Sequence, residues 1–347
     1  MAGAARPRLV DVAQRAGVSV GTASDALAGK NRIPDDTRDR VRRAADELGY
    51  VPNRVARALQ AGHLPLIGLV MTPLLERSRF DAYRSAWIET IGAATLAAAE
   101  RGYGLTVLPG FAATKLETLP LAGLIALDAE ADATEVQRAA ELGIRTVTDN
   151  RTATATVHVR TDVAATVPAV MDHFRASGAT RPAMTTTDVE TTMTRGLVDA
   201  YTAWCATHGV EPLVARIDAA APDASTQAED ALLEAGADAL YITAPDRSTQ
   251  IGRIAMRRER GLPRVLLALL DDDIDGRMAS LGITTVRIGL GDVVRRSVTA
   301  LIDALEADPA AATRIDGSFT LEVRDSSLPP RPWDGIERRR GNGSTAS

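Results

Sequence analysis

The chain has 347 residues, enough for two or three domains, and 45% of them are hydrophobic. Its one cysteine, Cys205, excludes an intramolecular disulfide, and the absence of a long apolar stretch leads us to expect a cytoplasmic protein without a membrane segment. The net charge is −5, yet residues 1–62 hold 11 Lys or Arg against 7 Asp or Glu, so the basic amino-terminal end is the candidate for a nucleic-acid partner.

Three short helices are predicted in the first fifty residues. In LVDVAQRAG the apolar residues recur at helical spacing, and Gly17 offers a left-handed stop. A second helix begins after Ser19, a good N-cap, and ends at Gly29. Its buried side chains are expected to be Val20, Ala23 and Leu27. A third helix runs from Pro34 to Gly49.

This spacing is typical of a helix-turn-helix, although a three-helix bundle without any ligand would show it too. In a helix-turn-helix the second helix lies in the major groove and presents its early residues to base edges. Here those residues are Val20, Gly21, Thr22, Ser24 and Asp25.

Residues 49–62, GYVPNRVARALQAG, predict a hinge helix. Pro52 ends the third helix, and Asn53 can cap a new helix with Val55, Ala56 and Leu59 on one side. Helices below about 12 residues are marginal in water, so we expect this one to form only when docked. Small alanines, a projecting leucine and flanking arginines suit a helix that wedges a base step in the minor groove. An ordinary linker helix is the alternative.

The segments LVDVAQRAGVSVGTASDALAG and IPDDTRDRVRRAADELGYVPNRVARALQAG resemble the LacI/GalR (lactose-repressor) family of bacterial transcriptional regulators. The resemblance covers residues 8 to about 330. It implies an all-α helix-turn-helix headpiece over residues 1–50 and a hinge helix over residues 51–63. An α/β periplasmic-binding-protein-like core of two parallel-sheet subdomains would follow over residues 64–330. Residues 331–347 lack periodic apolar residues and predict a disordered tail.

The resemblance also implies which residues contact DNA. Base edges would be read by Val20, Gly21 and Asp25. Contacts to the DNA backbone would come from Leu9, Ser19, Thr22, Ser24, Asn31, Tyr50, Asn53 and Arg54. Leu59 would be the wedge, on the hinge-helix side that carries Ala56.

Two positions depart from the family pattern. Asp25 stands where the family commonly has an Arg that reads guanine, and Arg8 stands where a capping Thr is common. An Asp at position 25 could accept a hydrogen bond from cytosine N4, or it could face solvent and repel phosphate. We therefore expect an operator that differs from those typical of the family.

Beyond the hinge, strand-like runs such as LPLIGLVM, YGLTVLP and LAGLIALD alternate with helical runs. Such alternation predicts parallel sheets covered by helices on both faces, with ligands near the carboxyl ends of the strands. The resemblance adds three crossovers between two subdomains that close on a small effector. The segment from Gly110 to Leu121 is shorter than the resemblance implies, so we expect a truncated helix there.

The effector contacts implied by the resemblance are Thr72, Asp149, Met193, Asp246 and Asp271. Met193 stands where sugar-sensing members have an Arg that grips the ligand, three residues before Gly196. Arg195 does not replace that Arg, because on a helix it would point about 200° away. Met193 therefore speaks against a conventional sugar effector, and we expect a small molecule that is a sugar or another metabolite. Each Asp can equally be a helix cap or a solvated charge.

These patterns predict a sequence-specific DNA-binding regulator, in the form of a repressor, that binds a palindromic double-stranded operator as a homodimer and responds to a small-molecule effector. We expect no cofactor and no enzymatic activity, because the four histidines (His63, His158, His173, His208) have no metal-binding spacing and no nucleophile motif accompanies them. Two alternatives stay open: a solute-binding protein without a DNA role, and a degenerate regulator that binds its operator without an effector.

Overall fold

The computed structural model describes residues 7–27, 33–50, 64–71, 81–109, 116–127, 134–148, 155–218, 220–221, 223–259, 264–306 and 313–329. They belong to two compact units, Met1–Leu64 and Pro65–Ser347, which we treat separately as the headpiece and the core. The hinge segment 51–63 and residues 330–347 lie outside the described residues. So do seven predicted site residues: Asn31, Asn53, Arg54, Ala56, Leu59, Thr72 and Asp149.

The described residues of the headpiece form three helices, α1 (Leu9–Ala16), α2 (Val20–Leu27) and α3 (Asp35–Leu48), as the sequence predicts. Gly17 and Gly49 follow α1 and α3 with φ of 66° and 64°, in the left-handed region that ends a helix at little cost for glycine. The buried side chains that hold the three helices together are Val12, Ala13, Ala16, Ala23, Ala26, Val41, Ala44 and Ala45.

The prediction that Val20 of α2 is a core residue is wrong. Val20 is 45% exposed, whereas Ala26, which we did not expect in the core, is fully buried. Ala23 and Ala26 lie on the face of α2 that meets the other two helices, and Val20 lies beside that face, 60° from Ala23 and 120° from Ala26 at 100° per residue. Leu27 is only partly buried at the edge of this cluster. An apolar residue in the first turn of a short helix does not by itself say which side faces the core.

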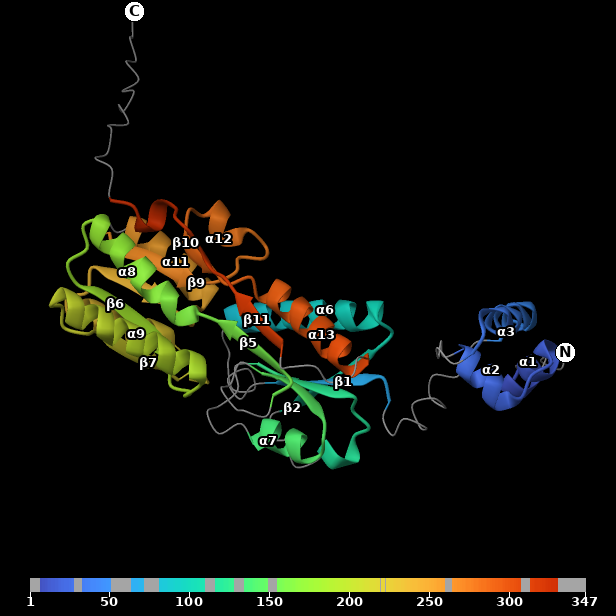
Figure 1. Ribbon diagram of the computed structural model, residues 1–347. Helices are drawn as coiled ribbons and strands as arrows, with labels where there is room; N and C mark the ends of the chain where they lie inside the picture. Colours follow the sequence, from blue (N-terminus) through green and yellow to red (C-terminus); the bar gives the residue numbers. More distant parts are fainter. Residues whose placement is uncertain are drawn as a thin grey trace, which may run out of the picture. The chain divides into compact units, whose positions relative to one another are not determined.

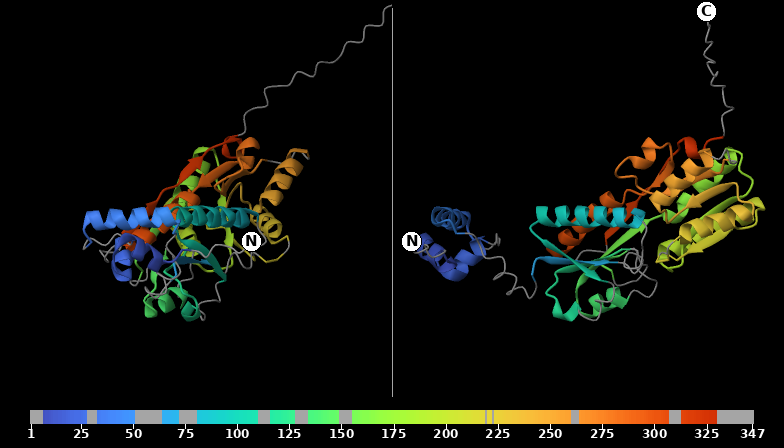
Figure 2. Two further views of the ribbon diagram at one scale, coloured as in Figure 1. Left: turned by 90° about the vertical axis from the view of Figure 1, so that its right-hand side faces the viewer. Right: turned by 180° about the vertical axis from the view of Figure 1, so that it is seen from behind.

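The first sheet of the core is parallel, with strand order β11-β5-β4-β3-β1-β2. Its strands are β1 (Leu66–Met71), β2 (Gly104–Pro109), β3 (Gly123–Ala126), β4 (Arg145–Thr148), β5 (Val157–Thr161) and β11 (Thr313–Gly317). Helices α6 (Asp81–Glu100) and α13 (Leu290–Glu306) cover one face, and α7 (Thr134–Glu141) covers the other. Helix α13 packs along α6, as the view from behind in Figure 2 shows.

The second sheet has strand order β12-β10-β9-β8-β6-β7 and is parallel except for β12. Its strands are β6 (Pro182–Thr187), β7 (Val214–Ile217), β8 (Ala239–Ile242), β9 (Leu266–Leu270), β10 (Thr284–Arg287) and β12 (Thr320–Glu322). Its helices are α8 (Thr166–Ala176), α9 (Thr192–His208), α10 (Ala224–Glu234), α11 (Arg247–Glu259) and α12 (Arg277–Ser280), with short 3-10 turns at Val163–Ala165 and Asp325–Ser327. They cover both faces.

The chain passes between the two sheets three times, after β5, after β10 and after β11 (Figure 1). Each of these strands leaves its sheet at the carboxyl end and leads to an element of the other sheet's subdomain. The carboxyl ends of the parallel strands in both sheets therefore face each other. The predicted fold class and the three crossovers are confirmed.

Three further observations concern the described residues. Where we expected a truncated helix between β2 and β3, the described residues 116–118 form a single 3-10 turn. A Cβ on Gly123 would lie 3.0 Å from a methyl carbon of Leu301, so glycine lets α13 approach β3 closely. Within the described part of the chain, no helix is long and apolar enough to cross a membrane.

Candidate nucleic-acid interface and effector site

The exposed face of α2 carries the residues predicted to read bases. At 100° per residue, Val20, Gly21, Ser24 and Asp25 share one side of the helix, opposite Ala23 and Ala26. Val20 and Gly21 are exposed, and Ser24 and Asp25 are half-buried. Exposure of Val20 means that an apolar side chain is available to a thymine methyl group. The structure therefore brings the three predicted base readers together on one face.

Ser19 caps α2, as predicted. Its Oγ accepts a hydrogen bond from the Thr22 backbone N–H at 3.0 Å and lies 2.8 Å from the Thr22 hydroxyl oxygen. This places two hydroxyl groups at the positive end of α2, where backbone amides favour an anion such as a phosphate.

Arg8 stands at the N-cap of α1, and its guanidinium has no acceptor atom with which to cap the helix. Asp11 compensates in part, because its Oδ2 accepts a hydrogen bond from the Arg8 backbone N–H at 2.7 Å. One of the two hydrogen bonds of a capping box, from the N-cap backbone N–H to the Asp11 side chain, is therefore present although the Thr that the resemblance implies is missing. Both side chains are exposed, so the guanidinium of Arg8 remains accessible at this end of the headpiece.

Leu9 and Tyr50, the two remaining described residues that are predicted to contact DNA, are half-buried and pack against the headpiece core. The Tyr50 backbone N–H donates to the Ala45 carbonyl at 2.8 Å, in the turn that follows α3. Both residues thus have a structural role, and their contacts to the DNA backbone stay predictions.

In the core, three consecutive carboxylates at the carboxyl end of β9 hold three different elements. Asp271 pairs with Arg247, the first residue of α11, whose Nε donates to Oδ2 at 2.7 Å and whose Nη2 donates to Oδ1. The Asp271 side chain is 1% exposed and that of Arg247 is 7% exposed. Hydrogen bonding to Asp271 raises the pKa of the Arg247 guanidinium.

Asp272 holds the start of α13 at the second crossover. Its Oδ1 accepts hydrogen bonds from the backbone N–H groups of Ile288 at 2.5 Å and Gly289 at 3.2 Å, and its Oδ2 accepts from Leu290 at 2.8 Å. Asp272 lies at the end of a strand of the second sheet, and α13 packs on the first sheet. This carboxylate therefore ties the two subdomains together.

Asp273 caps the short helix α12 by accepting from the Met278 N–H at 2.7 Å and the Ala279 N–H at 2.8 Å. Its φ of 46° lies in the left-handed region, which is uncommon for a residue other than glycine. The turn at this position directs the carboxylate back onto α12.

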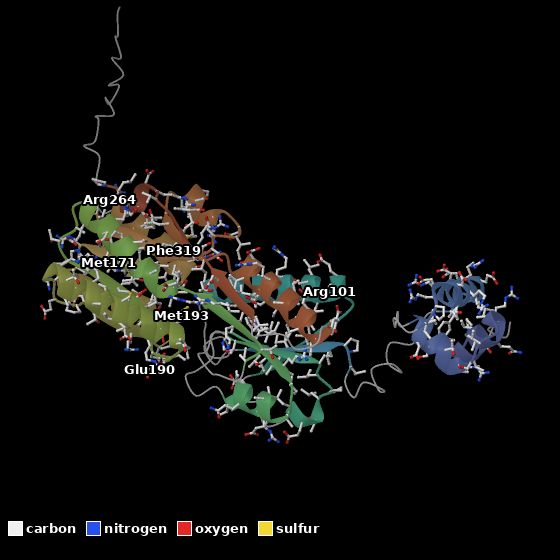
Figure 3. All side chains as sticks on the ribbon, in the orientation of Figure 1. Arg101, Met171, Glu190, Met193, Arg264 and Phe319 are labelled. Carbon is white, nitrogen blue, oxygen red and sulfur yellow. The ribbon has the colours of Figure 1, made fainter. Side chains whose placement is uncertain are left out.

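The other predicted effector contacts in the described core also have structural partners. Asp246 precedes α11 and accepts from the Thr249 N–H at 3.1 Å, which makes it the N-cap. Met193 is half-buried in the first turn of α9 and packs against the core of the second sheet, where Figure 3 labels it. Arg195 is exposed and does not reach the position of Met193. Asp246, Asp271 and Met193 thus follow β8, β9 and β6 at the same sheet edge.

Arg247 is the residue that sequence reasoning missed. Its neighbour Asp246 is predicted as an effector contact, whereas a single Arg in the first turn of a helix gives no signal of burial. Because the partner Asp271 lies 24 residues away in sequence, only the packing of α11 against β9 brings them together.

No grouping of three or more His, Cys, Asp or Glu side chains suited to a metal ion occurs among the residues that the structure describes. His173 Nε2 lies 2.7 Å from Ser327 Oγ, but Ser327 is fully buried and its hydroxyl also contacts Thr284 at 2.6 Å. Cys205 is buried too, and burial raises the pKa of its thiol. Neither side chain is placed as a nucleophile that a substrate can reach.

Known proteins resemble both units. Residues 8–53 match the family model "Bacterial regulatory proteins, lacI family", and residues 171–327 match "Periplasmic binding protein-like domain". The maltose regulon regulatory protein MalI of Escherichia coli K12 is 49% identical over 74 residues, 21% of this chain and 22% of that protein. The transcriptional regulator CelR of Thermobifida fusca is 33% identical over 114 residues, 33% of each chain. The matches thus span only a fifth to a third of these relatives.

Solved structures share the fold at low sequence identity. A Lac repressor dimer bound to operator and the anti-inducer ONPF has a TM-score of 0.68 at 20% identity, covering 93% of this chain and all of that chain. A CelR–cellobiose complex has a TM-score of 0.61 at 21% identity, covering 92% of this chain and all of the other. The two family models match in this order along a chain with this fold, so the chain combines an amino-terminal segment that matches the lacI family of bacterial regulatory proteins with a periplasmic-binding-protein-like core.

Proposed function

We propose that this protein is a sequence-specific DNA-binding transcriptional regulator, acting as a repressor, that binds a palindromic operator in the cytoplasm as a homodimer and responds to a small-molecule effector. The observation that supports this proposal is the exposed face of α2, on which Val20, Gly21 and Asp25 lie close to the capped, positive end of the helix. A phosphate at that end would set the register, and the side chains on the face would read bases.

The homodimer is supported by an exposed apolar stripe on α6. Ile88 is 71% exposed and Leu96 is 68% exposed, and the two lie eight residues apart on the same side of the helix, with exposed Gly92 between them. Large apolar side chains grouped at helical spacing typically mark an interface. Two copies related by a twofold axis would bury this stripe and present two headpieces to two half-sites.

The effector would bind where the carboxyl ends of the two sheets face each other, as in other open α/β folds. Among the described residues the cysteine is buried and no group of His, Cys, Asp or Glu suits a metal ion. We infer a regulator that binds its ligand without converting it.

The test of DNA binding is selection of bound fragments from random DNA, followed by a gel-shift assay with the selected operator. Val20→Ala should lower the affinity for that operator about fivefold, since one apolar base contact contributes about 1 kcal/mol. Val10→Ala is the matched control, because Val10 on α1 is 44% exposed and lies on another helix. An equal effect of both substitutions, or no selected sequence at all, would contradict base reading by α2.

The test of the dimer is analytical ultracentrifugation of the protein with its operator. Two chains per operator are expected, and Leu96→Glu should shift the protein toward monomer by placing a charge in the interface. Leu142→Glu, on a leucine that is 37% exposed beyond α7, is the matched control and should leave the dimer intact. One chain per operator in the wild type would refute the proposed symmetry.

The alternatives give different results. A solute-binding protein without a DNA role would select no sequence, and an effector-independent regulator would bind its operator but show no ligand heat in calorimetry.

A further inference from the structure

The Arg247–Asp271 pair occupies and buries a carboxylate that the family resemblance places in the effector site. Both oxygens of Asp271 accept from the guanidinium of Arg247, and Oδ1 also accepts from the Asp273 backbone N–H at 2.7 Å. Because the Asp271 side chain is 1% exposed, a ligand has no open path to its oxygens.

The pair lies at the sheet edge where the effector would bind. Asp271 follows β9 directly, and Arg247 begins the helix that follows β8, so both stand at carboxyl ends that face the first sheet. At the neighbouring strand, β6, the position where the resemblance implies a ligand-gripping Arg is occupied by Met193, which packs into the core (Figure 3). The guanidinium at this edge thus comes from α11 instead of α9, and its partner is a carboxylate of the same chain.

A neutral sugar is poorly suited to displace this guanidinium. Sugar hydroxyls would have to take over the oxygens of Asp271 and leave Arg247 buried without its anion. Its second carboxylate, Asp275, lies 3.3 Å from Nη1 and is 55% exposed, so water weakens that contact. Breaking a buried ion pair by removing one partner is strongly unfavourable, because the remaining charge has no compensation.

We propose that Arg247 is a specificity-determining residue of the effector site: its guanidinium occupies Asp271 and closes this carboxylate to the hydroxyl groups of neutral sugars. The inference rests on the proposed function, since it concerns the effector of the same regulator. Arg247 thus pairs from within the protein with the carboxylate that the resemblance assigns to the effector.

The first test measures access to Asp271 without any ligand. Full-length protein is labelled with a carbodiimide and an amine, and the labelling of Asp271 is followed by mass spectrometry. Asp271 should be protected in the wild type and labelled several-fold faster in Arg247→Ala. Arg253→Ala is the matched control, because Arg253 is also on α11, is 13% exposed and pairs with a different buried carboxylate, Glu229, at 2.9 Å. This control should leave Asp271 protected.

The second test measures binding of cellobiose and lactose, two neutral disaccharides, by calorimetry. The wild type should bind neither sugar, Arg247→Ala should bind at least one of them, and Arg247→Ala combined with Asp271→Asn should lose that binding. Circular dichroism checks that each variant is folded. If Arg247→Ala does not fold, Arg247→Lys replaces it, because a single ammonium covers only one of the two Asp271 oxygens and should give faster labelling than in the wild type.

Three results would overturn the proposal: rapid labelling of Asp271 in the wild type, wild-type sugar binding that Asp271→Asn abolishes, or an exposed Asp271 in a folded variant that still binds neither sugar. Operator binding by the wild type is measured in parallel. Its absence would refute the proposed regulator, whereas the labelling result would still decide whether Arg247 occupies Asp271.

Discussion

Replacing Asp272 should weaken the second crossover, where this carboxylate holds the first residues of α13. Asp272→Ala removes a helix cap of about 1–2 kcal/mol. It also leaves the amides of Ile288 and Leu290, both half-buried, without their acceptor, at about 1 kcal/mol each. The amide of exposed Gly289 adds little, because water can replace the carboxylate there. Because the cap consists of these same hydrogen bonds, the two contributions overlap, and we expect the free energy of unfolding to fall by about 2–4 kcal/mol.

The measurement is urea unfolding of the full chain, followed by circular dichroism. Asp272→Asn keeps one acceptor oxygen and should lose about half as much stability as Asp272→Ala. Asp275→Ala is the control in the same loop, because its carboxylate is 55% exposed and should contribute about 0–1 kcal/mol. If Asp272→Ala and Asp275→Ala destabilised the protein equally, the three hydrogen bonds would not hold the crossover and the reasoning would fail.

Three further predictions concern the headpiece, the hinge and the pH response. Asp25→Arg should change the base preference at one position of each half-site, and an unchanged selected sequence would mean that Asp25 reads no base. Leu59→Ala should lower specific but not nonspecific affinity and reduce the bend in a circular-permutation gel shift; parent-like binding and bending would make the hinge only a linker. Burial, and then repulsion by Asp272, raises the pKa of Glu89 above its ordinary value of 4.5. The protonated Glu89 therefore stabilises the fold below that pH, and this stabilisation is lost as the pH rises through the pKa of Glu89 in the folded protein. Glu89→Gln should flatten the resulting fall in melting temperature between pH 4.5 and 7 in calorimetry, whereas an unchanged slope would exclude Glu89 as its source.

Local signals were sufficient for much of the fold. Apolar residues recur at helical spacing in the first two headpiece helices, Ser19 caps α2, and Gly17 and Gly49 end α1 and α3. Each of these signals lies within a few residues of the helix that it defines. The alternation of strands and helices in the core likewise follows from hydrophobic runs and the turns between them. The residues of α2 that share one exposed face could be predicted because helical geometry fixes which side chains lie together, and base reading by them stays a prediction. Val20 shows the limit, since its apolar character suggested burial although its position on the helix is exposed.

What lies at the effector site was decided by tertiary structure. Sequence places Asp246 and Asp271 at strand ends, but it does not say that Asp246 caps α11 or that Arg247 fills both oxygens of Asp271. The Arg247–Asp271 contact joins a helix to a distant strand and forms only when α11 packs against the end of β9, whereas the Asp246 cap is local to the start of α11. A carboxylate in the sequence is equally a ligand contact, a cap or half of an ion pair. The choice depends on which side chains reach it in the folded chain, because a buried charge must find its partner there.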